Sequence, residues 1–312
     1  MPDPVSLTDV VDLYLARCRV EGKSPRTTRA YQETLGRFLR SCDKAGVRDR
    51  VDAVSTADVI RYCDGFAHLS LETRHRYFRE IRCFFNWCIE AGLLDASPFR
   101  GLKNVRLPQR VVAPFSAKDI QELLAHCDPA TPVGTRNRAV VLTLLDTGVR
   151  CAELVSLDLA DWGPGDRRLL VRSGKGNKQR VVPFAERCAD ALLAYLDDRG
   201  HEPGPLFCAS NGARRLRPTV RIGTSGLRHL LRRLGDRSGV SRVHAHRFRH
   251  TFATWAIEQD AREIDVQHLL GHAGPEMVRR YTSSYCSEQA AQRHATFSPA
   301  EHALRLASTP DS

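Results

Sequence analysis

The stretch from residue 243 to residue 281 constrains this chain most, because basic and aromatic side chains recur in it at helical spacings. Between His246 and Asp260 apolar residues recur without a proline or glycine, which predicts a helix. Residues three and four apart share a helix face, so His246, Arg249 and His250 face one way. The apolar residues Phe248, Phe252 and Trp255 face another way. We therefore expect a helix that rests on a core and offers imidazole and guanidinium groups to a pocket.

A short helical segment, Leu-Leu-Gly-His-Ala-Gly, follows this helix. Gly271 permits a close turn there, and His272 lies just beyond it. Tyr281 follows nine residues later, directly after two arginines. A single histidine or tyrosine is usually a solvated or half-buried side chain, so the prediction of a catalytic pocket depends on the whole set.

A third motif, Thr-Gly-Val-Arg-Cys-Ala-Glu-Leu, occupies residues 147–154. Gly148 is expected to make the turn that delivers Arg150 to the start of a helix. Glu153 lies three residues further on, where its carboxylate can orient the guanidinium. Alone, such a pair is more often an exposed ion pair of little energetic value.

A fourth motif, Gly-Lys-Gly-Asn-Lys-Gln-Arg at residues 174–180, lies between two short apolar runs. The runs at 169–172 and 180–183 predict the strands of a hairpin whose glycines permit positive φ, with Lys175 at its tip. The spacing G-x-x-x-x-G-K-[ST] of a nucleotide-binding loop is absent, so ATP binding is not expected.

In the order in which they occur along the chain, these four motifs resemble the signature of the tyrosine recombinases, the phage-integrase and Xer-like family. They cover about half of the chain, and the departures are small: Phe248 stands where leucine is commoner in the family. A second tyrosine, Tyr285, lies one helical turn after Tyr281, but the spacing from Leu-Leu-Gly-His selects Tyr281.

The resemblance implies a metal-free cleavage of DNA. The expected catalytic residues are Tyr281 as nucleophile, Arg150 and Arg249 on the phosphate oxygens, His272 as a hydrogen-bond donor, His246 as proton acceptor and Lys175 as general acid, with Glu153 and His250 in support. Planar guanidinium groups suit phosphate geometry, and a tyrosine of pKa about 10 needs activation. The product is a 3′-phosphotyrosine with a free 5′ hydroxyl, and neither a cofactor nor a metal is expected.

The expected fold is mainly α-helical with a small β-hairpin or sheet. Four amphipathic helices in residues 1–99 predict a basic bundle, similar to the family's SAM-like core-binding domain. Residues 100–113 are expected to form a linker, since residues 96–114 hold three prolines and little periodicity. Residues 114–298 are then expected to form an α+β catalytic domain, and residues 299–312 a C-terminal helix and tail. Family members exchange such a helix between protomers, and the alternative is a helix docked on its own domain.

Finer expectations concern the end of the catalytic domain. Leu206 to Cys208 predict a short strand, and a helix is expected near 226–238. Residues 210–225 are basic and loop-like, which favours contacts with phosphate.

Composition agrees with a polyanionic partner. The net charge is +11 and the pI about 9.4, and residues 1–110 and 111–312 are both net positive. The ten cysteines are scattered without zinc-ligand spacing and indicate reduced thiols in the cytoplasm. No apolar run approaches the roughly 18 residues of a membrane span, and no signal peptide is visible.

The expected partners are double-stranded DNA recombination sites, bound by a homotetramer across two sites, with a related recombinase or a DNA-bending accessory protein as an optional addition. Two alternatives stay open: a type IB topoisomerase, which uses similar residues for relaxation, and a non-catalytic DNA-binding relative. The sequence does not choose between integration, excision, transposition and dimer resolution.

Overall fold

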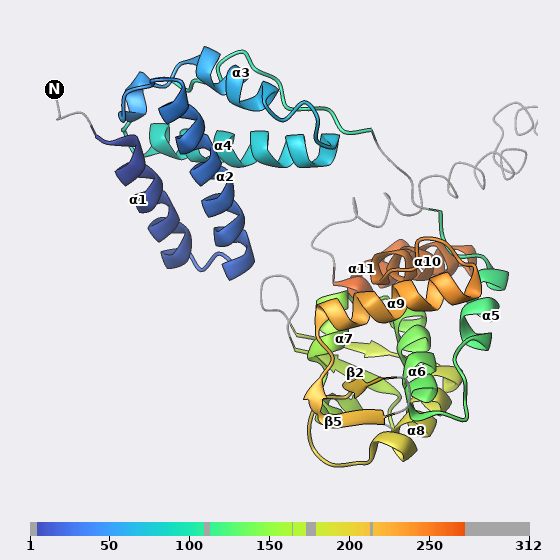
Figure 1. The fold of residues 1–312 in the computed structure, drawn as a ribbon. Coiled ribbons are helices and arrows are strands. Elements are labelled where there is room, and N and C mark those ends of the chain that lie inside the picture. Colours follow the sequence, from blue (N-terminus) through green and yellow to red (C-terminus); the bar gives the residue numbers. More distant parts are fainter. Residues whose placement is uncertain (1–4, 109–112, 164, 173–178, 213–214, 272–312) are drawn as a thin grey trace, which may run out of the picture. The chain divides into compact units, whose positions relative to one another are not determined.

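The structure is a computed structural model that describes residues 5–108, 113–163, 165–172, 179–212 and 215–271. The chain divides into two compact units, Met1–Arg110 and Val111–Ser312 (Figure 1). The described part is mainly helical with two small antiparallel sheets, which confirms the predicted fold class.

The first unit is a helical bundle. Its helices are α1 (Leu7–Val20), α2 (Pro25–Lys44), α3 (Thr56–Asp64) and α4 (Leu71–Glu90), with a 3₁₀ turn at Val51–Ala53. Each α-helix begins after a serine whose hydroxyl accepts a hydrogen bond from the main chain three residues on: Ser6, Ser24, Ser55 and Ser70. Such caps satisfy main-chain N–H groups that have no partner inside the helix, so the serines fix where the helices start.

An aromatic core holds this bundle together. Tyr14 of α1 meets Phe84 of α4 edge-on at 5.5 Å between ring centroids, and Phe38 of α2 meets Phe85 of α4 at 5.8 Å. Edge-to-face pairs of this kind add about 0.5–1.5 kcal/mol to the burial of the rings.

Residues that follow the predicted domain boundary at residue 99 still contact the first unit. Phe99 is buried in its core, and Leu102 and Val105 pack against that core. Arg82 lies over the Phe99 ring and donates to the carbonyl oxygen of Leu102. The apolar residues of this segment have no helical or strand period, and for that reason the sequence pattern indicated a linker.

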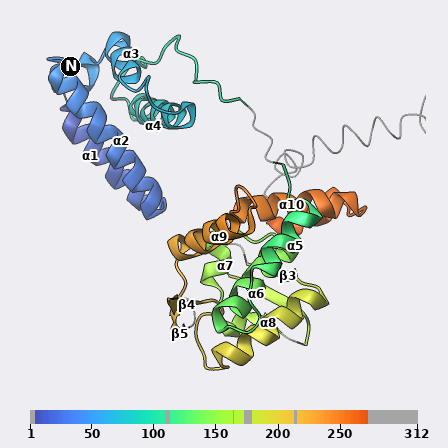
Figure 2. The ribbon, with the colours of Figure 1, turned by 45° about the vertical axis from the view of Figure 1, so that its right-hand side comes forward.

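The second unit surrounds a buried helix. Its elements are α5 (Ala117–Ala125), α6 (Pro132–Thr147), α7 (Cys151–Ser156), a 3₁₀ turn (Leu159–Asp161), β1 (Trp162–Gly163), β2 (Arg168–Val171), β3 (Arg180–Pro183), α8 (Glu186–Arg199), β4 (Cys208–Asn211), β5 (Arg215–Arg221), α9 (Thr224–Ser238), α10 (Ala245–Glu258) and α11 (Glu263–Leu270). Helix α6 packs against α8 and α10 (Figures 1 and 2). It is buried on most of its surface, as expected of a helix covered on several sides.

Strands β1, β2 and β3 form one antiparallel sheet, in which Leu169 pairs with Val182. The predicted hairpin is therefore present, and its connecting residues 173–178 lie outside the described residues.

The predicted loop at residues 210–225 is wrong, because β5 runs through it and pairs with β4. The predicted strand at 206–208 lies slightly early, since β4 begins at Cys208. The alternation in β5 is hidden by its composition: Leu216 is buried while Arg215 and Arg217 are exposed. Proline is also unfavourable in a strand because it lacks an N–H donor. Pro218, however, lies where the pairing of β4 and β5 shifts register, and both strands of a two-stranded sheet are edge strands, which tolerate proline.

Candidate active site

The turn between α6 and α7 needs a glycine. Gly148 has φ +58°, in the left-handed region that glycine adopts at little cost. A Cβ atom built there would lie 2.6 Å from Cδ2 of Leu270 and 2.8 Å from Cδ1 of Phe252. Helices α10 and α11 therefore approach the main chain of this turn more closely than any side chain permits.

Arg150 is the N-cap residue of α7, where the sequence placed it. Glu153 accepts from the main-chain N–H of Arg150 at 2.8 Å and from its Nη1 at 2.7 Å. The carboxylate is 2% exposed and the arginine side chain 33% exposed. The expected pair is present, and because Glu153 is buried it is not the weak surface pair that its spacing alone would suggest.

Arg180, on β3, also belongs to this cluster, although the sequence motifs did not predict it as a site residue. Its Nη1 and Nη2 lie 3.0 Å and 2.7 Å from the two oxygens of Glu153. Burial alone would raise the pKa of Glu153, but the bonds from Arg180 and Arg150 outweigh burial and hold that pKa at about 2. The carboxylate is therefore ionised at neutral pH.

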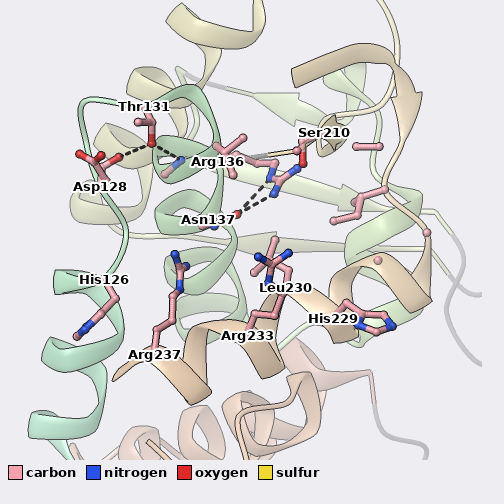
Figure 3. Close-up of a pocket in the computed structure, with 17 residues that line it drawn as sticks. His126, Asp128, Thr131, Arg136, Asn137, Ser210, His229, Leu230, Arg233 and Arg237 are labelled. Atoms are coloured by element: carbon pink, nitrogen blue, oxygen red, sulfur yellow. Dashed lines mark hydrogen bonds between the residues drawn. The ribbon is translucent and has the colours of Figure 1, made fainter. Parts of the chain in front are cut away.

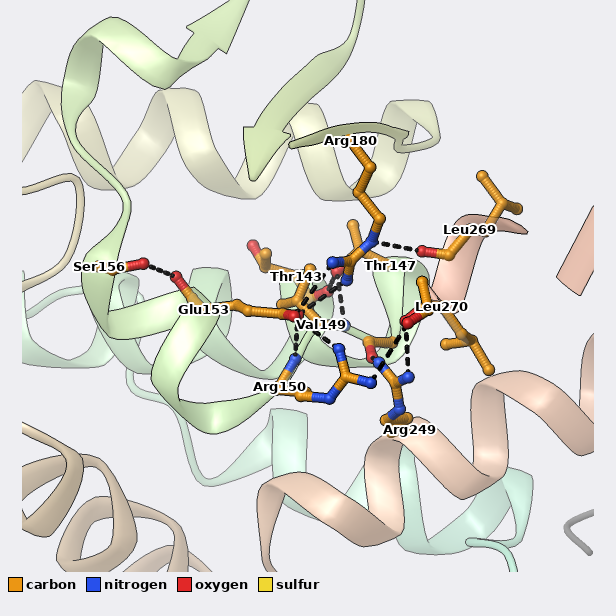
Figure 4. A network of polar contacts seen from close by, with 12 residues as sticks. Thr143, Thr147, Val149, Arg150, Glu153, Ser156, Arg180, Arg249, Leu269 and Leu270 are labelled. Atoms are coloured by element: carbon orange, nitrogen blue, oxygen red, sulfur yellow. Dashed lines mark hydrogen bonds and ion pairs between the residues drawn. The ribbon is translucent and has the colours of Figure 1, made fainter. Parts of the chain in front are cut away.

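Three arginines converge on the end of α11 (Figure 4). The carbonyl oxygen of Leu269 accepts from Arg180 at 2.8 Å, that of Leu270 from Arg249 at 2.6 Å, and that of Gly271 from Arg150 at 3.5 Å. The last carbonyls of a helix have no partner inside it and carry the negative end of its dipole, so cations are favoured there.

Arg249, on α10, also donates to the carbonyl oxygen of Gly148 at 2.8 Å and is 2% exposed. One guanidinium thus connects the Gly148 turn, α10 and α11. Main-chain carbonyls and Glu153 accept hydrogen bonds from Arg150, Arg180 and Arg249. These bonds fix the positions of α7, β3 and α10 relative to one another.

His246 lies one turn before Arg249 on α10 and is exposed at the surface of the cluster. Partial burial, together with the positive charges of Arg249 and Arg150, lowers the pKa of His246. Its ring stacks on that of His244 at 6.5 Å between centroids. His246 is therefore neutral at pH 7 and can accept a proton.

His250 is 4% exposed and its Nδ1 lies 3.3 Å from the hydroxyl of Thr254. Burial, followed by the charges of His246 and Arg247, lowers its pKa to about 4. The structure therefore places His250 inside α10's packing as a neutral residue, behind His246.

The chain that enters the second unit is fixed to α10. Arg247 lies 4.0 Å from the ring centroid of Phe115 and donates to the carbonyl oxygens of Ala113 and Pro114. The hydroxyl of Thr251 accepts from the main-chain N–H of Phe115 at 2.8 Å. The helix that carries His246 and Arg249 is thus anchored at its start.

Arg150, Glu153, Arg249 and His246 are brought together in the described residues. Lys175, His272 and Tyr281 lie outside them. Within the described ranges, no group of three or more His, Cys, Asp or Glu side chains could hold a metal ion. The helices there also include none that is long and apolar enough to cross a membrane.

Comparison with known families decides the class of the chain. The model of the phage integrase family matches residues 114–288, and that of the phage integrase N-terminal SAM-like domain matches residues 11–95. The chain belongs to the phage integrase family.

Curated relatives align with nearly the whole length of this chain. Tyrosine recombinase XerC of Bacillus pumilus is 30% identical over 284 residues, which span 88% of this chain and 91% of the relative. Tyrosine recombinase XerA of Thermococcus kodakarensis is 30% identical over 282 residues, spanning 90% and 92%. The chain is therefore a tyrosine recombinase of the Xer type, a site-specific DNA recombinase.

Solved structures share the fold. The XerH site-specific recombinase bound to palindromic difH substrate has a TM-score of 0.71 at 19% identity, covering 91% of this chain and 83% of that chain. A lambda integrase dimer bound to a COC′ core site has a TM-score of 0.69 at 16% identity, covering 89% and 77%.

Proposed function

We propose that this recombinase cuts and rejoins double-stranded DNA at a specific site through a phosphotyrosine formed on Tyr281. The convergence of Arg150, Arg180 and Arg249 at the end of α11 carries the proposal. Two of these guanidinium groups, those of Arg150 and Arg180, bond to the carboxylate of Glu153, and Arg249 donates to main-chain carbonyls. Three positive charges thus stand against one negative charge in this network, so the cluster attracts an anion. His272 directly follows the helix end that they share.

In the proposed mechanism Arg150 and Arg249 hold the non-bridging oxygens of the scissile phosphate. Planar guanidinium forks fit these oxygens, and a network that is already in place stabilises the developing charge without reorganising. Arg150 is suited to this role because a third of its side chain is exposed while its main-chain N–H and its Nη1 are fixed by Glu153. Glu153 and Arg180 act as positioning residues, and His250 supports His246 from within α10.

The oxygen of Tyr281 attacks phosphorus and its proton passes to His246, whose lowered pKa keeps the ring neutral and able to accept it. The bond to the 5′ oxygen breaks, and Lys175 protonates that oxygen while His272 donates a hydrogen bond to the phosphate. A 5′ hydroxyl of another strand then attacks the phosphotyrosine and releases the tyrosine. The phosphotyrosine stores the energy of the broken bond, so the proposed cycle consumes no ATP. The arginines, His272 and Lys175 supply the charge stabilisation and the proton, so the proposed steps call on no metal ion.

We propose recombination sites in duplex DNA as the substrate and a homotetramer on two sites as the active assembly. Basic charge in both units and the DNA complexes of the XerH and lambda integrase structures support the first part. The segment 299–312 is proposed to pass between protomers.

Covalent trapping tests the function. Purified protein is incubated in EDTA with nicked duplexes that span the DNA flanking its gene, and the products are separated on a denaturing gel. A protein–DNA adduct is expected with the natural sequence and with Tyr285→Phe, and none with Tyr281→Phe. An adduct that persists in Tyr281→Phe, or retained DNA binding without any adduct, contradicts the proposal.

A further inference from the structure

A basic pocket of about 300 Å³ lies between α6, α9 and the β4–β5 sheet (Figure 3). Its lining contains three arginines, Arg136, Arg233 and Arg237, and one carboxylate, Asp128. None of its lining residues belongs to the cluster around Glu153. The pocket is thus a second concentration of positive charge in the unit that carries the candidate active site.

Arg136 is a buried charge whose bonded acceptors are neutral. It is 5% exposed, and its Nη2 and Nε donate to Oδ1 of Asn137 at 2.9 Å and 3.2 Å. Its Nη1 donates to the carbonyl oxygen of Cys208 at 3.1 Å. In the part of the chain that the structure describes, no carboxylate bonds to it. Since a buried cation without a counter-charge is unfavourable, a group that brings negative charge into the pocket is favoured.

Arg233 and Arg237 increase this imbalance. Both extend from α9 toward α6 in Figure 3, and neither has a hydrogen bond or ion pair among residues 5–108, 113–163, 165–172, 179–212 and 215–271. The single carboxylate of Asp128 already accepts from the main-chain N–H of Ala130 at 3.0 Å. Arginine side chains directed into one space repel each other unless an anion lies between them.

The N-terminus of α9 contributes a further donor surface. Its N-cap residue is Gly223, which has no side chain to satisfy the first N–H groups of this 15-residue helix. Gly223 and Gly226 both line the pocket, and a Cβ at Gly223 would meet nothing within 4 Å. An uncapped helix start that opens on a pocket offers main-chain N–H groups and a positive dipole end to an anion.

We propose that this pocket binds a phosphate group. Guanidinium forks, main-chain N–H groups and the hydroxyl of Ser210 are donors that suit a tetrahedral oxyanion. A metal cation is disfavoured by three arginines against one carboxylate. The phosphate belongs either to the DNA backbone, in which case the inference rests on the proposed function, or to a free phosphate ion.

Free phosphate is tested first. The melting temperature of the full chain is measured in phosphate and in chloride at equal ionic strength, for the natural sequence, Arg233→Gln and Arg237→Gln. Arg187→Gln, an exposed arginine of α8 outside the pocket, is the control of equal charge. A site for free phosphate raises the melting temperature of the natural chain and of Arg187→Gln, and raises that of the two pocket variants less. A general salt effect stabilises all four proteins equally.

The DNA backbone is tested with the same four proteins by measuring duplex affinity against salt concentration. Loss of one phosphate contact lowers the slope of log K against log salt by about 0.9. A slope that falls in the pocket variants and not in Arg187→Gln identifies the DNA backbone as the source. An unchanged slope with a lost response to free phosphate identifies the ion. If neither response distinguishes the pocket variants from Arg187→Gln, the proposal is overturned.

The proposal of a phosphate site and the proposal of catalysis by Tyr281 can be contradicted independently of each other. Trapping of the Tyr281 adduct reports on catalysis and requires no response to free phosphate. Surface arginines are chosen for the variants because removal of the buried Arg136 could unfold the unit, which would leave the result open to two explanations.

Discussion

The guanidinium of Arg180 holds both carboxylate oxygens of Glu153, with Nη1 3.0 Å from Oε1 and Nη2 2.7 Å from Oε2. The same side chain donates through Nε to the carbonyl oxygen of Leu269. Arg180 thus connects β3, α7 and α11, and the first residue of β3 follows closely on the segment that carries Lys175. We expect it to determine how firmly the catalytic cluster is assembled.

Replacing Arg180 by methionine leaves the buried carboxylate of Glu153 with one fewer cation. We expect a loss of about 3–5 kcal/mol in the free energy of unfolding, since one partner of a buried ion pair has been removed. Urea denaturation measures this loss. The double variant Arg180→Met/Glu153→Gln should recover part of it, and strictly additive losses would show that the two residues are not coupled.

The acid stability of the protein should depend on Glu153. Its pKa in the folded protein is about 2, below the ordinary 4.5, so the unfolded chain takes up the proton first as the pH falls. The stabilisation is complete above pH 4.5 and disappears between pH 4.5 and 2, and it amounts to about 3 kcal/mol. Denaturation at a series of pH values should show this loss in the natural protein and a smaller one in Glu153→Gln. Identical pH profiles would contradict the assignment.

Gly148→Ala should damage the site more than an equivalent change elsewhere. Gly148 and Gly239 both end a helix with positive φ, at +58° and +71°. Alanine is strained at each, at a cost of about 1–2 kcal/mol. Only at Gly148 does the new methyl group also collide with Leu270 and Phe252. Gly148→Ala is therefore expected to lose more stability than Gly239→Ala and to lose adduct formation, and equal effects would show that the close packing is unimportant.

The pH dependence of adduct formation should report His246. Partial burial and the charges of Arg249 and Arg150 lower its pKa, so the ring stays neutral to a lower pH than an ordinary histidine. With DNA far below saturation, the rate should stay level from pH 8 to pH 7 and fall only below about 6.5, the ordinary value for histidine. His246→Gln should be slow and lack this acid limb. A variant that keeps the limb would assign it to another group.

Local patterns predicted much of the fold and the site. The helix that carries His246 and Arg249 follows from the 3.6-residue period of its apolar residues, and Gly148 could be identified as a turn because only the local main chain is involved. The pair between Arg150 and Glu153 was predictable for the same reason, since it spans three residues.

Long-range contacts were not predictable in this way. Arg180 meets residues 27 and 89 positions away, at Glu153 and Leu269, and nothing in its own neighbourhood indicates either partner. The one available signal was an arginine at the first position of an apolar strand. Likewise, the packing of Leu102 and Val105 on the first unit depends on tertiary contacts that a segment without periodicity does not reveal.

The use of main-chain carbonyl oxygens at the end of α11 limits which mutations can affect this contact. Every amino acid carries the same carbonyl, so no substitution of Leu269 or Leu270 removes the atoms that accept from Arg180 and Arg249. Mutation can disturb this contact only by replacing the arginines or by bending the helix. These main-chain acceptors are therefore robust to sequence drift, unlike the side-chain acceptor Glu153. The vulnerability of the contact at α11 is concentrated in the codons for the arginines and in the glycines that let the main chain turn.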